Sequence, residues 1–214
     1  PAAGGDFYDY QITQSARFIR SGDDDNTYLK RSPSTAGNRK THTLSLWVKR
    51  TQITILETFF SAQVTSTTNY VDGYKFGDAQ ATASNRIRLY VNGEQVTAFG
   101  TETYIAEDYE GGVCSTREHA VGWGTGANNG QGFFGYMAEV ILADGTSYPP
   151  TQFGESKNGV WIPKDPDGTS FGTTGFHLDF ANSSNFGNDV SGNNNDFTNV
   201  GMAASAQMLD TPTF

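Results

Sequence analysis

The sequence contains a single cysteine, Cys114, among its 214 residues. One thiol cannot form an intrachain disulfide, so a disulfide-stapled scaffold is excluded and the fold depends on burial and hydrogen bonding. Long apolar runs are also missing, since no stretch reaches the roughly 18 to 20 apolar residues that a membrane-spanning helix needs. The sequence therefore predicts no insertion into a membrane.

Basic residues are few. Lys and Arg number 14 against 23 Asp and Glu, which gives a formal net charge of -9. Nucleic-acid binding relies on clustered Lys and Arg that displace counterions from phosphates, whereas the basic residues here are scattered along the chain. We therefore expect neither nucleic acid nor an anionic membrane as a partner.

The residues that are abundant favour strands and turns. The chain has 25 glycines and 13% aromatic residues, and short segments of alternating apolar and polar residues recur between turn-forming residues. We predict strands over residues 16–19, 28–31, 41–49, 55–61, 70–76, 86–91, 94–98, 119–123, 132–142, 176–180 and 197–200. This pattern predicts an all-β protein, an antiparallel β-sandwich of the jelly-roll type.

The faces of three predicted strands can be assigned from the alternation. Asn92-Gly93 predicts a type I′ turn that pairs 86–91 with 94–98. The apolar residues expected to face the core from these strands are Leu44, Leu46 and Val48 in the first and Ile87, Leu89 and Val91 in the second. The third segment is apolar on both faces, with Phe134, Tyr136, Ala138 and Val140 on one and Phe133, Met137 and Ile141 on the other. We expect that strand to be central in its sheet or to face another subunit.

Several blocks of sequence carry a resemblance to a known family. They are SARF (15–18), YL (28–29), AGNRK (36–40), LSLWVKR (44–50), ASNRIRLYVNG (83–93), FGYMAEV (134–140), GFHLDF (175–180) and DVSGNNNDF (189–197). In this order they resemble the concanavalin A-like lectin/glucanase superfamily, specifically laminin-G-like modules in structural proteins of marine tailed phages. The resemblance implies a concanavalin A-like jelly roll over residues 15–200, with an N-terminal arm at 1–14 and a C-terminal arm at 201–214.

The sequence differs from these modules in lacking one expected strand. The family carries a further aromatic-rich strand before the one that ends in the Asn-Gly hairpin, whereas here YKFG (74–77) runs almost directly into DAQ (78–80). Either the strand is deleted or a segment is missing near Gly77. Unbroken pairing in the sheet would indicate a compact variant, and a gap one strand wide would indicate a missing segment.

Candidate catalytic groups are sparse. Glucanases of the superfamily place two carboxylates two to four positions apart on one strand, and no predicted strand here has such a pair. Glu139 could act as a general acid if buried, but we expect it to pair with an arginine or a backbone donor or to face solvent. Cys114 and His119 show no sign of a positioned pair, so we expect an inert thiol and no enzymatic activity. The histidines His42, His119 and His177 lack zinc-type spacing.

No cofactor is predicted to be required, and calcium is the one ion with candidate ligands. Oxygen-bearing side chains gather in two turns, and the candidate ligands are Asp23, Asp25, Asp189 and Asn193. The alternative is that these residues form the turns by hydrogen-bonding their own backbone.

Carbohydrate binding has candidate residues in two loops. Tyr104, Asp108 and Tyr109 occupy one loop, and Trp123, Asn128 and Asn129 occupy the other. The two would form one site if their strands were neighbours. In the alternative, Trp123 belongs to the core and the asparagines only form a turn.

These observations predict a non-catalytic protein of the virion surface, acting as a capsid decoration, fibre or tail component. Its expected partners are other virion proteins and host-surface glycans. The alternatives are a glycan-cleaving enzyme of the same fold and a purely structural assembly protein without a ligand. Apolar residues near both chain ends predict a homo-oligomer, and these are Phe7, Tyr8, Tyr10, Met202, Met208 and Phe214.

Overall fold

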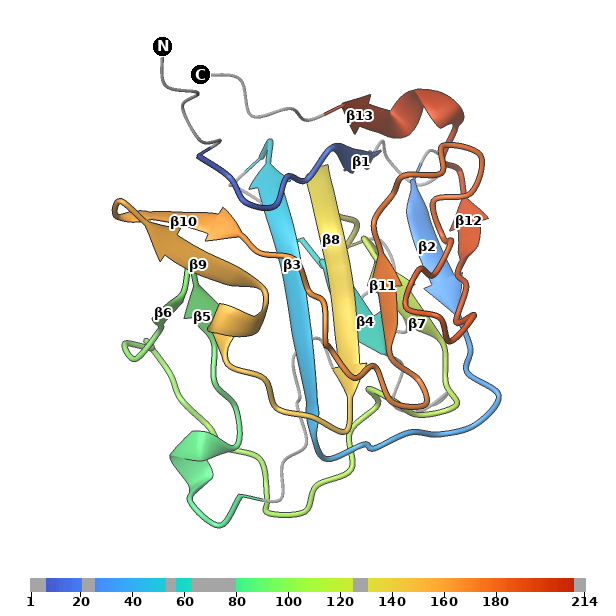
Figure 1. The fold of residues 1–214 in the computed structure, drawn as a ribbon. Helices are drawn as coiled ribbons and strands as arrows, with labels where there is room; N and C mark the ends of the chain where they lie inside the picture. The colour runs from blue at the N-terminus through green and yellow to red at the C-terminus, as the bar shows by residue number, and fades with distance from the viewer. Residues whose placement is uncertain (1–6, 21–25, 53–56, 63–79, 125–130, 210–214) are drawn as a thin grey trace.

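The computed structural model describes residues 7–20, 26–52, 57–62, 80–124 and 131–209, which form two antiparallel sheets packed as in a β-sandwich (Figure 1). The first sheet contains β1 (Gln14–Phe18), β3 (His42–Arg50), β8 (Gly135–Asp144), β11 (Phe176–Leu178) and β13 (Gln207–Leu209). The second contains β2 (Tyr28–Arg31), β4 (Phe60–Ala62), β7 (His119–Val121) and β12 (Thr198–Val200). The prediction of an all-β antiparallel protein is therefore confirmed.

Two hairpins and short 3-10 helices complete the described structure. The hairpins are β5 (Tyr90–Val91) with β6 (Glu94–Gln95), and β9 (Gly154–Lys157) with β10 (Val160–Pro163). The 3-10 helices are η1 (Ala83–Asn85), η3 (Pro150–Gln152) and η4 (Ala204–Ala206). Within the described residues, no helix has the length and apolar character that a membrane crossing requires.

Strand β8 lies in the middle of the first sheet. One of its edges pairs with β3 from His42 opposite Asp144 to Arg50 opposite Gly135. Its other edge pairs with β1 in the first half of the strand and with β11 in the second half. Of the two alternatives for the segment 132–142, the central position is the one observed (Figure 1).

A β-bulge in β8 changes which of its residues face the core. The register with β3 shifts between Ser45 and Trp47, and Glu139 has a φ of 48°, so residues 139 and 140 together oppose Leu46. Before the bulge Met137 joins the core, and after it Val140 does. The faces predicted for the segment 132–142 assumed unbroken alternation of side chains. That assignment is wrong, because the bulge shifts the alternation by one residue.

Phenylalanine dominates the core between the two sheets. The fully buried rings include Phe18, Phe133, Phe176, Phe180 and Phe186. Burial of each such side chain contributes roughly 1.5 to 3 kcal/mol, and edge-to-face pairs such as Phe18–Phe133, with centroids 6.1 Å apart, add to this. From β3, the predicted core residues Leu44 and Leu46 pack against this cluster, whereas Val48 is 44% exposed.

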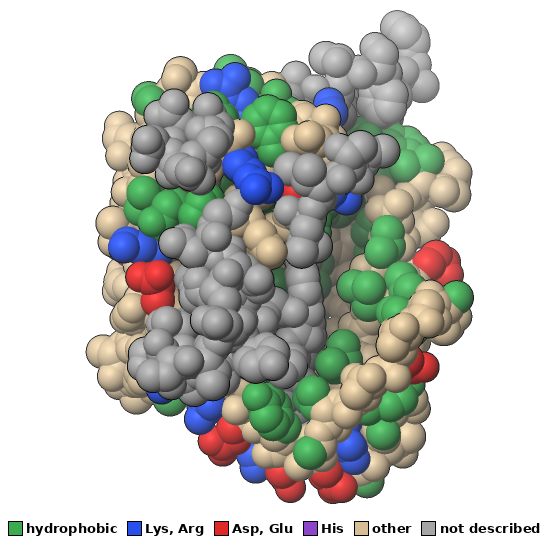
Figure 2. All heavy atoms as spheres, turned by 180° about the vertical axis from the view of Figure 1, so that it is seen from behind, with side chains coloured by type: hydrophobic (Ala, Val, Ile, Leu, Met, Phe, Trp, Pro, Cys, Tyr) green, Lys and Arg blue, Asp and Glu red, His purple; other side chains and the backbone are tan. Residues whose placement is uncertain are grey.

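The β5–β6 hairpin confirms the predicted turn but not the predicted faces. Asn92 and Gly93 have φ angles of 50° and 81°, as a type I′ turn requires. Leu89 and Val91 are nevertheless exposed, so the expectation that they face the core is wrong. The hairpin is a separate two-stranded sheet whose Gly93 packs against the Trp161 ring. Figure 2 shows the protein from behind, so the side that carries this hairpin lies on the right, where hydrophobic side chains reach the surface.

Several strands were missed or lie elsewhere than predicted. The β9–β10 hairpin turns at Asn158-Gly159, with φ angles of 54° and 79°, so the same dipeptide signal was available there. Residues 201–209 extend the sandwich, because Met202 and Ala206 join the core and β13 pairs with β1. The predicted strand 70–76 and the question of a missing segment near Gly77 lie outside the described residues.

Candidate functional site

The outer face of the first sheet carries two rows of side chains that run across its strands. In one row Tyr136 of β8 lies between Lys49 of β3 and Arg17 of β1. In the next row Trp47 lies opposite Ala138, and the same register places Ser15 on the other side of Ala138. Since directly opposed side chains lie about 5 Å apart, the small residues leave a hollow beside the large ones.

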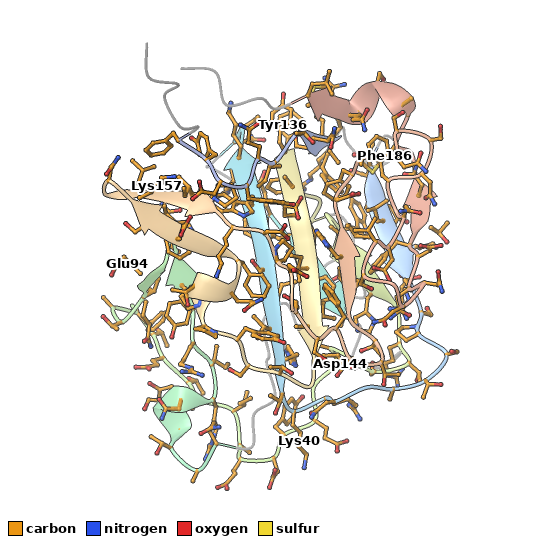
Figure 3. The ribbon with its side chains drawn as sticks, viewed as in Figure 1. Lys40, Glu94, Tyr136, Asp144, Lys157 and Phe186 are labelled. Atoms are coloured by element: carbon orange, nitrogen blue, oxygen red, sulfur yellow. The ribbon has the colours of Figure 1, made fainter. Side chains whose placement is uncertain are left out.

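This hollow is the floor of a groove of about 310 Å³, which we call the aromatic groove. Four aromatic side chains line it, and these are Tyr8, Trp47, Tyr136 and Trp161. Ile12, Pro163 and Lys49 complete its walls. In Figure 3, Tyr136 marks its position near one end of β8. Grooves of this size with an aromatic lining and few polar groups are typical of small-molecule sites.

The wall contributed by residues 7–13 is held against the rest of the protein. Asp9 forms an ion pair with Lys157 at 3.2 Å, and the same ammonium group lies 5.8 Å from the centroid of the Phe7 ring. Tyr10 hydrogen-bonds to the Glu139 side chain. These contacts keep Tyr8 and Ile12 over the groove.

A second cavity of about 320 Å³ is lined by Tyr10 of this segment together with Asp165, Asp167, Phe171 and His177. We call it the acidic cavity. Next to it, Glu139 is 6% exposed and its Oε2 lies 2.5 Å from His177 Nε2. Burial raises the pKa of Tyr10, and the adjacent Glu139 raises it further.

The expectation that Glu139 pairs with an arginine or a backbone donor, or faces solvent, is therefore wrong. The bulge turns its side chain onto the outer face of the sheet, where an imidazole and a phenol bind it. This combination had no signal in the sequence, because the three residues come from distant segments.

The predicted calcium ligand Asp189 is saturated by protein donors. Its carboxylate accepts hydrogen bonds from the backbone N–H groups of His177, Ser191 and Asn195 at 2.8 to 2.9 Å, and from the Ser191 hydroxyl at 2.8 Å. Asn193 donates its amide to the carbonyl oxygens of Gly172 and Gly175. The bonds from Ser191 and Asn195 to Asp189 lie within the turn, as the alternative expects, whereas those of His177 and Asn193 join the turn to the segment 172–177.

The remaining calcium candidates, Asp23 and Asp25, lie outside the described residues. In the part of the chain that the structure describes, no three His, Cys, Asp or Glu side chains are grouped so that they could hold a metal ion.

The two loops predicted to bind carbohydrate lie at opposite ends of the sandwich. Asp108 forms an ion pair at 3.2 Å with Lys40, just before β3, which lies near the Asp144 end of β8 (Figure 3). Trp123 packs against Gly132, just before the other end of β8. Because β8 has ten residues, roughly 30 Å separates its ends, and the loops do not form one site.

The remaining residues predicted to bind carbohydrate lie in different surroundings. Tyr104 is 38% exposed and Tyr109 is half-buried. Trp123 stacks on Tyr28, with ring centroids 5.3 Å apart. Asn128 and Asn129 lie outside the described residues. The aromatic groove was missed, although two signals were available: Trp47 on the non-core face of its predicted strand, and a strand at 132–142 that is apolar on both faces and carries Tyr136.

The Cys114 thiol is fully buried, and burial raises its pKa to about 12. His119 contacts the backbone of Cys114: its Nε2 accepts a hydrogen bond from the Cys114 N–H at 3.1 Å, and its Nδ1 lies 2.8 Å from the Arg117 carbonyl oxygen. The ring is therefore neutral, with its proton on Nδ1. These contacts do not form a thiolate–imidazolium pair.

We expect the Cys114 thiol of the native protein to react with Ellman's reagent at pH 8 roughly a thousandfold more slowly than a free thiol, because little thiolate forms. The same protein in denaturant serves as the control and should react at once with one equivalent. Stoichiometric labelling of the native protein within minutes would contradict the expectation.

Comparisons with known proteins give no identification. No family model, curated protein or solved structure matches the chain. The observed strands establish an all-β protein with two antiparallel sheets packed as in a sandwich. Because a fold does not determine what a protein binds, its function has to be inferred from the chemistry of the site.

Proposed function

We propose that this chain is a non-catalytic, carbohydrate-binding module of the laminin-G-like jelly-roll type, carried on a virion surface as a capsid decoration, fibre or tail component. The observation that carries the binding function is the aromatic groove. Its four aromatic rings offer flat apolar faces to the C–H faces of a sugar, and Ser15 and Lys49 offer donors to its oxygens.

The assignment to the laminin-G-like type is supported by where the resembling blocks fall. LSLWVKR lies in β3, FGYMAEV in and just before β8, and GFHLDF in and around β11, and both β3 and β11 pair with β8. The virion location is supported by the phage character of the resemblance and by the net charge of -9. Other virion proteins, including further copies of this chain, are the proposed partners.

The absence of catalysis is proposed from the position of the carboxylates. None of the described residues that line the aromatic groove is Asp or Glu. The buried Glu139 is bound by His177 and Tyr10 beside the acidic cavity. A glycosidase needs two carboxylates that flank one sugar bond, and the aromatic groove offers no such pair.

A glycan array, followed by calorimetry with the best ligand, tests the proposal. We expect Trp47→Ala and Tyr136→Ala each to weaken binding at least about tenfold, as loss of an aromatic contact at a binding site does. Tyr104→Ala is the matched control, because it removes an exposed aromatic side chain that does not line the groove, in the loop that carries Asp108. We expect it to leave the affinity unchanged.

Three results would contradict parts of the proposal. Loss of binding in Tyr104→Ala with normal binding in the groove variants would move the site to the loop that carries Tyr104 and Asp108. Release of shorter oligosaccharides during incubation would contradict the absence of catalysis. A map or mass spectrum of purified particles without this chain would contradict the virion location.

A further inference from the structure

The aromatic groove lies beside two cations, Lys49 and Arg17, that form no ion pair with a carboxylate of the described residues. Lys49 lines the groove, and Arg17 lies beyond Tyr136 in the same cross-strand row. In a protein with a net charge of -9, this is a local region of positive charge.

Two carboxylates on elements that flank the groove are already engaged by other groups. Asp9, next to Tyr8 in the groove wall, is bound by Lys157 at 3.2 Å. Glu57 is bound by Arg50 at 2.6 Å and accepts a hydrogen bond from the backbone of Phe134. Because neither carboxylate is free and no described carboxylate forms an ion pair with Lys49 or Arg17, these two cations can bind an external anion.

Polar atoms of the groove floor point to the same kind of ligand. Ser15 lines the groove and is only 2% exposed, and its Oγ has no hydrogen-bond partner among the described residues. The Nε of Arg17 is buried and also lacks one. Buried polar groups are satisfied in the great majority of native structures, so two unsatisfied donors on neighbouring positions of β1 indicate a site for an acceptor.

We propose that the aromatic groove is specific for an acidic saccharide, whose carboxylate or sulfate is bound by Lys49 and Arg17. The Ser15 hydroxyl donates to the same sugar, and the ring packs against Tyr136 and Trp47. Hydrogen bonds between ionised groups are roughly twice as strong as neutral ones, so the charged substituent would decide which glycan is preferred. This inference rests on the carbohydrate-binding function proposed above.

The test compares three oligosaccharides of equal length by calorimetry: a neutral one, one that contains uronic acid, and one that carries sulfate esters. We expect an acidic ligand to bind at least about tenfold more tightly than the neutral one in about 50 mM salt, with a smaller ratio in about 300 mM salt. Comparison of the two acidic ligands identifies the preferred anion.

Variants then locate the anion site. We expect Lys49→Gln and Arg17→Gln each to weaken acidic-ligand binding roughly 5- to 30-fold and to leave neutral-ligand binding unchanged. Lys30→Gln is the matched control, since it removes a partly exposed lysine from the second sheet, and it should have no effect. Lys49 is exposed, so its variant should keep the thermal unfolding midpoint of the wild type.

The outcomes distinguish failure of the proposed anion site from failure of the proposed carbohydrate-binding function. Equal affinity for neutral and acidic ligands would overturn the anion site and leave carbohydrate binding in place. Binding of none of the saccharides would overturn both. A preference for acidic ligands that persists in both Lys49→Gln and Arg17→Gln would also overturn the assignment of these two residues.

Discussion

Replacing Asp144 with alanine is expected to lower the free energy of unfolding by about 3 to 5 kcal/mol. Asp144 ends β8 and is only 5% exposed. Its carboxylate accepts hydrogen bonds from the N–H groups of Asn38, Thr173 and Thr174 at 2.6, 3.1 and 2.9 Å, and from the Thr174 hydroxyl at 3.0 Å. Alanine would leave all of these donors without their acceptor.

Gly37 shows how closely the surrounding chain packs on this carboxylate. A Cβ on Gly37 would lie 1.9 Å from one carboxylate oxygen, so the loop before β3 packs directly on Asp144. One carboxylate thus joins two loops to the end of the central strand (Figure 3). The local structure of both loops should loosen in the variant.

Urea unfolding followed by tryptophan fluorescence measures the effect. Asp144→Asn keeps the shape and one acceptor oxygen, so its loss of stability should be smaller than that of Asp144→Ala. Glu94→Ala is the matched control, because Glu94 is an exposed carboxylate in the β5–β6 hairpin. It should change stability by less than about 0.5 kcal/mol. An equally small change in Asp144→Ala would contradict the assigned role.

Lowering the pH from about 6.5 to about 4 is expected to remove several kcal/mol of stability through His42 and His119. Burial lowers the pKa of each ring from 6.5 to about 4. Between these values the unfolded chain binds protons that the folded chain does not, so this stability is present above pH 6.5 and is lost as the pH falls. Each ring contributes on the order of 3 kcal/mol.

The contacts of His119 give a geometric reason for its low pKa. Because Nε2 accepts a hydrogen bond from the Cys114 N–H, a proton on Nε2 would oppose another N–H proton. Protonation therefore breaks this bond in addition to placing a charge in the core. The ring can charge only if this part of the structure opens.

Unfolding free energies measured at pH 7, 5.5 and 4 test this prediction. The comparison is between the wild type and a His42→Gln, His119→Gln double variant, which keeps every carboxylate. We expect a shallower dependence of stability on pH in the variant, because the remaining acid sensitivity comes from carboxylates in both proteins. Identical slopes would show that these rings do not titrate as proposed.

The sequence by itself determined the class of fold and several of its local features. Period-two alternation needs only neighbouring residues, so the strands around Leu44 and Leu46 and their inward side were predictable. The type I′ turn at Asn92-Gly93 was predictable because its positive φ angles depend on residue type alone. The burial of Cys114 is in line with the expected inert thiol, whose reactivity stays a prediction.

Tertiary structure alone decided where the sites lie. The bulge at Glu139 depends on the register between β8 and β3; it exchanged the faces of β8 beyond the bulge and turned the carboxylate toward His177. The aromatic groove requires Tyr8, Trp47, Tyr136 and Trp161 to meet, although about 150 positions of the chain separate the first from the last. Alternation within a segment specifies which way a side chain points; which distant segment it then faces is specified only by packing.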